Sequence, residues 1–168
     1  PATGNVYAFG VGGTLLALDP AGKLLWERSV VEDFGLVTTH GGRTVSPVID
    51  GDLVIVSGIA AGWGDLARAG HRFFAFDKKT GATVYVSSPG GRPFDTTYSP
   101  PIIGEVGGVR LLIAGGSDGA MHAIKPQTGE PVWNFTMSKR GLNTGALLAN
   151  GIAIVSHSEE NYDSSEMG

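Results

Sequence analysis

Short apolar runs alternate with turns rich in Gly, Asn, Asp and Pro along the whole chain. The runs are rich in Val, Ile, Leu and Thr, for example at residues 53–57 and 152–156, which favours β-strands. Asp50-Gly51 and Asn150-Gly151 stand between such runs and are typical of tight hairpin turns. The pattern predicts short antiparallel strands and almost no helix, apart from one helical turn allowed at residues 65–69, where Asp65 can cap it.

One segment occurs three times in register, at residues 14–26, 72–85 and 120–133. Each copy has an apolar strand with a central Ala, a turn closed by Gly, and an aromatic residue. The turn glycine and the aromatic keep the same two intervals, 59 and 48 residues. These residues are Gly22, Gly81 and Gly129, and Trp26, Tyr85 and Trp133. Such regularity indicates a structural repeat.

A second block precedes the first and recurs at residues 46–58, 99–115 and 144–156. Each unit therefore holds four short strands, at 46–49, 53–57, 72–76 and 83–87 in the fullest copy. Four-stranded units of this length are typical of propeller blades. A β-sandwich is the alternative, but a sandwich has no reason to repeat the turn glycine and the aromatic in register.

The sequence thus predicts an all-β fold, a β-propeller with four-stranded antiparallel blades, present as an incomplete arc of about three and a half blades. The units cover approximately residues 1–36, 37–93, 94–140 and 141–168, as one partial propeller over 1–168. An open arc leaves inter-blade faces uncovered at both ends. We therefore expect the chain to be a piece of a larger protein, truncated or only partly resolved.

Composition and charge exclude several classes of protein. The formal charge is −4 and no stretch gathers several Lys or Arg, so nucleic acid is not an expected partner. No apolar run approaches the ~18 residues of a transmembrane segment. The chain has no cysteine, which excludes disulfides, Cys-ligated zinc and iron–sulfur clusters within it.

The repeat resembles the pyrroloquinoline-quinone (PQQ) type propeller repeat, whose pattern is A-x-D-x-x-T-G-x-x-x-W. Residues 75–81 and 123–129 carry it, with Lys125 in place of the Asp and Tyr85 in place of the Trp, while the first copy is one residue short. Quinoprotein alcohol dehydrogenases share this repeat with the lipoprotein scaffold of the outer-membrane β-barrel assembly machinery. The resemblance implies a ring of seven or eight blades. It also implies that the aromatic residue docks between neighbouring blades, a structural role expected for Trp26, Tyr85 and Trp133.

Long connections indicate a binding face. The loop after the second strand is long in the second unit, at residues 58–71, and in the fourth, at 156–168, and both leave on the same face as the connections between blades. Long insertions on one face are how propellers build binding sites; drift at a tolerant surface is the alternative. The binding-face candidates are Trp63, Asp65, Arg68, His71, Glu159, Glu160, Tyr162 and Asp163. Further polar candidates on this face are His40, Arg43, Arg92, Asp95, Arg140 and Asn143.

No two His residues have the sequence spacing that is typical of metal ligands, so no metal site is predicted from histidines. Glu159, Glu160 and Asp163 offer the oxygen ligands that Ca²⁺ prefers. They lack the D-x-D-x-D-G pattern, so a solvated acidic loop is favoured over a calcium site. His122 lies inside a predicted strand and is expected to be packed there.

Two functions remain open. The favoured one is a non-catalytic binding or scaffold module of a larger exported bacterial protein, periplasmic or otherwise in the cell envelope or outside the cell. It would need no cofactor and would bind protein partners, as a subunit of a complex or through further blades. The alternative is a segment of a PQQ-dependent alcohol or sugar dehydrogenase, which would bind PQQ and Ca²⁺. In such enzymes PQQ usually stacks between a Trp and a disulfide of adjacent cysteines, and this chain has no cysteine.

Overall fold

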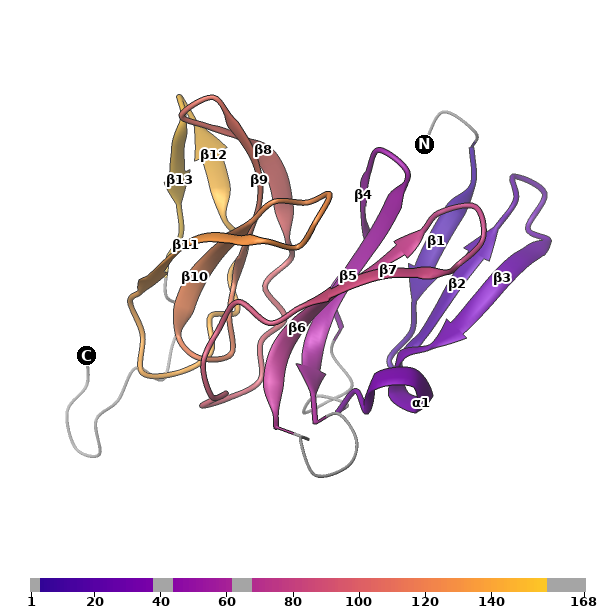
Figure 1. The fold of residues 1–168 in the computed structure, drawn as a ribbon, viewed down its shortest axis with the longest axis horizontal. Coiled ribbons are helices and arrows are strands. Elements are labelled where there is room, and N and C mark those ends of the chain that lie inside the picture. The colour runs from indigo at the N-terminus through magenta and orange to yellow at the C-terminus, as the bar shows by residue number, and fades with distance from the viewer. Residues whose placement is uncertain (1–3, 38–43, 62–67, 157–168) are drawn as a thin grey trace.

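Thirteen strands form four antiparallel sheets in the computed structural model, which describes residues 4–37, 44–61 and 68–156 (Figure 1). The first sheet holds β1 (Val6–Phe9), β2 (Thr14–Leu18) and β3 (Leu24–Ser29). The second holds β4 (Val48–Asp50), β5 (Leu53–Ala60), β6 (Gly70–Asp77) and β7 (Thr83–Ser87). The third holds β8 (Ile102–Val106), β9 (Val109–Gly115), β10 (Ala120–Ile124) and β11 (Pro131–Thr136), and the fourth β12 (Leu147–Ala149) and β13 (Ile152–Ile154).

Strands that follow one another in the chain are neighbours in each sheet. Each sheet is therefore an up-and-down blade, and the blades stand side by side as a partial β-propeller, as the repeat predicted (Figure 1). We refer to the four sheets as blades 1 to 4 in chain order. Among the described residues, no helix is long and apolar enough to cross a membrane.

The apolar core lies between the blades rather than inside one central cluster. Because side chains alternate along a strand, Val54 and Phe74 face blade 1, whereas Ile55 and Phe73 face blade 3. A third cluster, around Ile113, joins blades 3 and 4. The middle strands of blade 2 are buried on both faces, which is why their sequence reads as a continuous apolar run rather than an alternating one.

The repeated alanine and aromatic are partners across two strands in blades 1 to 3. Ala17 pairs with Trp26, Ala75 with Tyr85, and Ala123 with Trp133, and in each blade a β-bulge follows the alanine. A small residue opposite a large one leaves room for the ring on the shared face of the sheet. The constant spacing between the alanine and the aromatic in the sequence therefore reflects the same cross-strand pair in three blades.

Two of the repeated aromatics also reach the next blade along the chain. Trp26 Nε1 donates to the carbonyl of Lys78 at 3.1 Å, and Tyr85 Oη donates to the carbonyl of Pro126 at 2.8 Å. Each acceptor lies three residues before a turn glycine, and the ring lies over that glycine. A Cβ would stand 2.8 Å from Trp26 Cδ2 at Gly81 and 2.5 Å from Tyr85 Cδ2 at Gly129. The turn glycine thus provides the space into which the preceding blade inserts its ring.

The Tyr85 hydroxyl gives a direct test of this joint. Tyr85→Phe removes one hydrogen bond and leaves the Pro126 carbonyl without its donor, so we expect a loss of about 1 kcal/mol in the free energy of unfolding. Denaturant unfolding of the intact protein measures it. Val84→Ala, at an exposed site on the same strand, should change stability by less than about 0.5 kcal/mol. Equal losses in both variants would contradict a specific joint.

Side-chain carboxylates accept hydrogen bonds in two turns of the repeat. Asp77 Oδ1 accepts from the N–H groups of Lys79 and Thr80 at 3.0 and 2.8 Å, and Asp19 Oδ1 accepts two backbone N–H groups in the same way. Where Lys125 replaces the Asp, its ammonium instead pairs with Glu130 across the turn at 2.7 Å. Turn geometry is therefore preserved although the residue changes.

One helix was not predicted. α1 (Val30–Phe34) begins directly after β3, where the sequence pattern predicted no helix. Ser29 caps it by accepting from the Glu32 N–H, and Gly35 ends it at φ 66°. This Ser-x-x-Glu capping pattern followed by Gly was present in the sequence.

The second blade also differs from the prediction at its central hairpin. β5 continues to Ala60 and β6 begins at Gly70, where Ile59 pairs with His71 and Ala60 with Gly70. Residues assigned to the long insertion are thus strand at both of its ends. The extension is supported from blade 1, because the Val37 N–H donates to the Ile59 carbonyl and the Ala61 N–H to the Gly35 carbonyl, at 2.8 and 2.9 Å.

Candidate binding site on the loop face

The connections from second to third strands and those between blades meet on one face, which we call the loop face; α1 and the open ends of β5 and β6 mark it at the lower side of Figure 1. The connection that precedes blade 3 and the one that follows it both form hydrogen bonds with the β9–β10 turn. The Phe94 N–H donates to Ser117 at 2.8 Å, and the Leu142 N–H donates to Gly116 at 3.0 Å. The loop face is therefore built by hydrogen bonds between successive blades.

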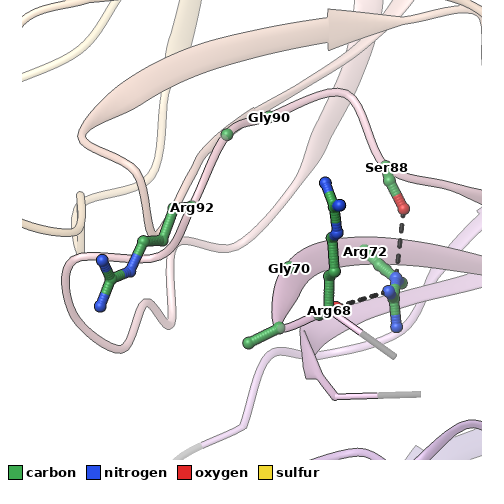
Figure 2. Close-up of a pocket in the computed structure, with 8 residues that line it drawn as sticks. Arg68, Gly70, Arg72, Ser88, Gly90 and Arg92 are labelled. Carbon is green, nitrogen blue, oxygen red and sulfur yellow. Dashed lines mark hydrogen bonds between the residues drawn. The ribbon is translucent and has the colours of Figure 1, made fainter. Parts of the chain in front are cut away.

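A pocket with a volume of about 540 Å³ opens on this face. It lies between the start of β6 and the connection that follows β7 (Figure 2). Ligand pockets have volumes of ~300–1,000 Å³, so its size suits a small group or a few side chains. Its lining residues are Arg68, Ala69, Gly70, Arg72, Ser88, Gly90, Gly91 and Arg92.

Arg72 holds the walls of the pocket together. Its Nη1 donates to the Ala60 carbonyl at 3.0 Å and its Nη2 to the Arg68 carbonyl at 2.8 Å. Its Nε donates to Ser88 Oγ at 3.2 Å, a contact that Figure 2 shows as a dashed line. One guanidinium group thus joins both ends of the β5–β6 connection to the segment after β7.

Arg68 and Arg92 bring two further positive charges. Within the described ranges, their guanidinium groups make no hydrogen bond or ion pair with another residue. Arg68 comes from the approach to β6 and Arg92 from the connection opposite (Figure 2). No described residue therefore occupies the donors of these two groups.

The glycine wall of the pocket is anchored from behind by a carboxylate. Asp118 Oδ2 accepts from the Gly91 N–H at 2.8 Å, and Asp118 Oδ1 contacts His122 Nε2 at 2.9 Å. A Cβ at Gly90 would stand 2.6 Å from Asp118 Oδ2, so only glycine allows this approach. Burial raises the pKa of Asp118, but the hydrogen bonds from His122 and Gly91 outweigh it and lower the pKa to about 2.

His71 lies behind the pocket, in the seam between blades 2 and 3. Its side chain is only 5% exposed, its ring lies 5.2 Å from that of Phe73, and its Nδ1 has no hydrogen-bond partner in the described part of the chain. Burial, followed by the charge of nearby His122, lowers the pKa of His71 to about 4. It is thus a neutral core histidine at pH 7.

The predicted binding residues are placed as follows. Arg68 lines the pocket, whereas His71 is buried behind it rather than on its rim. Trp26 and Tyr85 lie at blade joints, and Trp133 packs against the third core cluster. Arg92 lines the pocket too, Asp95 lies 3.8 Å from Arg140 as an ion pair, and Asn143 Oδ1 accepts from the Tyr98 N–H at 3.4 Å. The other candidates fall outside the described residues: Trp63, Asp65, Glu159, Glu160, Tyr162 and Asp163, and with them His40 and Arg43.

Sequence reasoning missed Arg72, Ser88 and the two glycines as parts of one site. A signal for Arg72 existed in the repeat itself. It stands where the other two copies have Thr14 and Ala120, so it is the one charged residue at that position of the three copies. The glycines could not be assigned without knowing where the connection after β7 runs.

Three comparisons relate the chain to known proteins. A family model described as the outer membrane protein assembly factor BamB matches residues 2–160. Among curated proteins, no sequence matches.

Solved structures share the fold. BamB from Moraxella catarrhalis aligns with a TM-score of 0.57 at 22% identity, over 87% of this chain and 40% of that one. The quinohemoprotein alcohol dehydrogenase from Comamonas testosteroni gives 0.58 at 19% identity, over 89% and 30%. A europium-containing methanol dehydrogenase gives 0.55 at 19% identity, over 82% and 31%. The chain thus spans less than half the length of each of these proteins.

The described residues do not fit PQQ or its metal ion. Trp26 and Trp133 are packed at blade surfaces, and the Trp26 indole N–H is already bonded to the next blade. The buried Asp50 is held by Arg110 and by Gln127 at 2.6 Å, and Asp118 is held by His122. In the described ranges no three His, Cys, Asp or Glu side chains cluster as metal ligands would.

Proposed function

The chain belongs to the family of the outer membrane protein assembly factor BamB, and on that premise we propose that it supplies consecutive blades to a scaffold of the bacterial cell envelope. The loop face of these blades would hold a protein partner within a larger complex. The observation that carries this proposal is the family match, because it runs through every blade of the arc. The scaffold itself would perform no catalysis.

The packing of the blades supports a rigid support rather than a moving part. Continuous apolar clusters fill each seam, and the joints at Trp26 and Tyr85 fix one blade to the next. Loops carried by such a rigid support are well suited to recognition. The arginine-lined pocket places Arg68 and Arg92, which form no ion pair with a described residue, on this face, where a partner can reach them.

Site-specific photo-crosslinking in cells tests the orientation. A photoreactive residue at position 140, on the loop face but outside the pocket, should form a crosslink to one defined protein, identified by mass spectrometry. The same residue at position 23 or 79, in turns at the opposite ends of the strands, serves as the matched control and should not. Equal crosslinks from both ends would contradict a partner on the loop face.

The envelope role has its own test. Cells that lack the protein should contain less of their outer-membrane β-barrel proteins, and the intact protein should restore them. Unchanged amounts of these proteins would argue against an assembly role while leaving the fold untouched.

A PQQ-dependent dehydrogenase is the second candidate, because two dehydrogenases share the fold at TM-scores of 0.58 and 0.55. In that case residues beyond those described would have to supply the quinone site. An absorbance spectrum of the intact protein after addition of PQQ and Ca²⁺ separates the two functions. A bound-quinone band with dye-linked alcohol oxidation would favour the enzyme.

A further inference from the structure

We propose that Arg68, Arg72 and Arg92 form a carboxylate-binding site, occupied by acidic side chains of an extended partner segment. The inference rests on the proposed function, since it names the chemistry by which a protein partner would be held. It concerns the pocket between β6 and the connection after β7 (Figure 2).

The described lining of the pocket is positively charged, whereas the chain as a whole carries a net negative charge. The sequence has 16 acidic and 12 basic residues, yet three of the eight residues that line the pocket are arginines and none is acidic. The nearest carboxylate described above, Asp118, lies behind the Gly90–Gly91 backbone and is paired with His122. The described lining residues therefore offer no carboxylate to balance the three positive charges.

The three arginines have different roles in the proposed site. Arg72 uses three of its N–H groups on Ala60, Arg68 and Ser88, so it acts as a positioning residue with two N–H groups left. Among the described residues, none accepts a hydrogen bond from the guanidinium group of Arg68 or of Arg92. A guanidinium presents paired donors that match the two oxygens of a carboxylate, which makes the free pair suited to two acidic side chains.

The shape of the pocket favours an extended segment. Ala69, Gly70, Gly90 and Gly91 form low walls between the arginines, and the hollow is open to solvent. A backbone can therefore approach closely while its side chains reach the guanidinium groups. A polyphosphate chain is disfavoured because it needs a basic stripe, which the sequence does not have.

The test uses the intact protein and three probes: a capped Glu-rich hexapeptide, its Gln counterpart, and inorganic phosphate. NMR of the arginine Nε–H groups and fluorescence anisotropy of the labelled peptides measure binding. We expect the Glu peptide to bind and the Gln peptide not to bind. Arg68→Gln and Arg92→Gln should each weaken Glu-peptide binding about tenfold, the scale of one lost charge-assisted contact.

Arg140→Gln is the matched control, because it removes the same charge from an exposed arginine of the loop face outside the pocket. It should bind the Glu peptide like the unaltered protein. Arg92→Lys keeps the charge but loses the planar fork and should recover only part of the affinity.

Each other outcome overturns the proposal in a distinct way. Binding of phosphate but not of the Glu peptide would make the pocket a small-anion site. Equal losses in Arg140→Gln and Arg92→Gln would reduce the effect to general charge. If the loop-face crosslink forms unchanged in Arg68→Gln/Arg92→Gln, the scaffold function stands and the carboxylate site falls.

Discussion

Gly119→Ala is expected to destabilise the protein by about 4 kcal/mol, combining strain at a positive φ with overpacking. Gly119 has φ +77°, and a Cβ there would lie 2.1 Å from the Ser138 carbonyl oxygen and 3.0 Å from that of Arg140. Its own carbonyl accepts the N–H groups of Met137 and Ser138 at 3.1 and 3.0 Å. The methyl group would therefore meet backbone that is itself hydrogen-bonded, and that backbone cannot move without breaking the connection after β11.

Gly108→Ala separates the cost of backbone strain at a positive φ from the cost of overpacking. Gly108 has the same φ of +77°, but no atom lies within 4 Å of its would-be Cβ. That variant should lose only the backbone strain, about 1 kcal/mol. Denaturant unfolding of the intact protein measures both variants under identical conditions. Similar losses at the two sites would mean that the contact between the β9–β10 turn and the next connection does not hold as described.

Acid should destabilise the protein in a range set by His71. The pKa of His71 is about 4 in the folded protein against 6.5 as the ordinary value. Below pH 6.5 the unfolded chain gains a proton that the folded protein does not take up, so stability falls as the pH decreases. The loss ends below pH 4 and amounts to about 3 kcal/mol, most of it reached by pH 4.5.

His71→Gln should remove this pH dependence, since the amide does not titrate. Unfolding free energies measured at intervals from pH 7.5 to 4.5 give the slope for both proteins. Asp118 supplies an internal contrast: its lowered pKa contributes stability that is present above pH 3.8 and lost as the pH falls through about 2. A slope between pH 6.5 and 4.5 that persists in His71→Gln would assign the effect to other groups. If His71→Gln fails to fold, His71→Leu provides the same comparison.

The repeat made the blades predictable because each blade uses the same local chemistry. The interval between Gly81 and Gly129 marked two equivalent turns, and the structure places the preceding aromatic over each. The assignment of four strands per unit followed from apolar runs that are buried on both faces. Helix α1 was missed because its segment was interpreted as part of the connection between two blades, although Ser29 and Glu32 carried the cap.

The pocket was less predictable than the fold, for a physical reason. Arg68 and Arg92 are 24 positions apart in the sequence, and they line one pocket only because the β5–β6 hairpin and the connection after β7 lie at the same end of one blade. Arg72 reads as one polar residue at the start of an apolar strand. Its three hydrogen bonds depend on where Ala60, Arg68 and Ser88 lie in the folded protein, and no local sequence pattern specifies those positions.

The joint between blades has a consequence for how such chains change by duplication. Blades 1 and 2 each carry an aromatic that inserts forward, and blades 2 and 3 each carry the turn carbonyl and glycine that receive it. A unit like blade 2, which has both halves, matches any copy of itself at either end. Gain or loss of a whole unit by recombination therefore creates no mismatched seam, whereas a partial unit that lacks the turn leaves the preceding ring without the glycine and carbonyl that receive it. The number of units can thus vary while the joint is inherited unchanged.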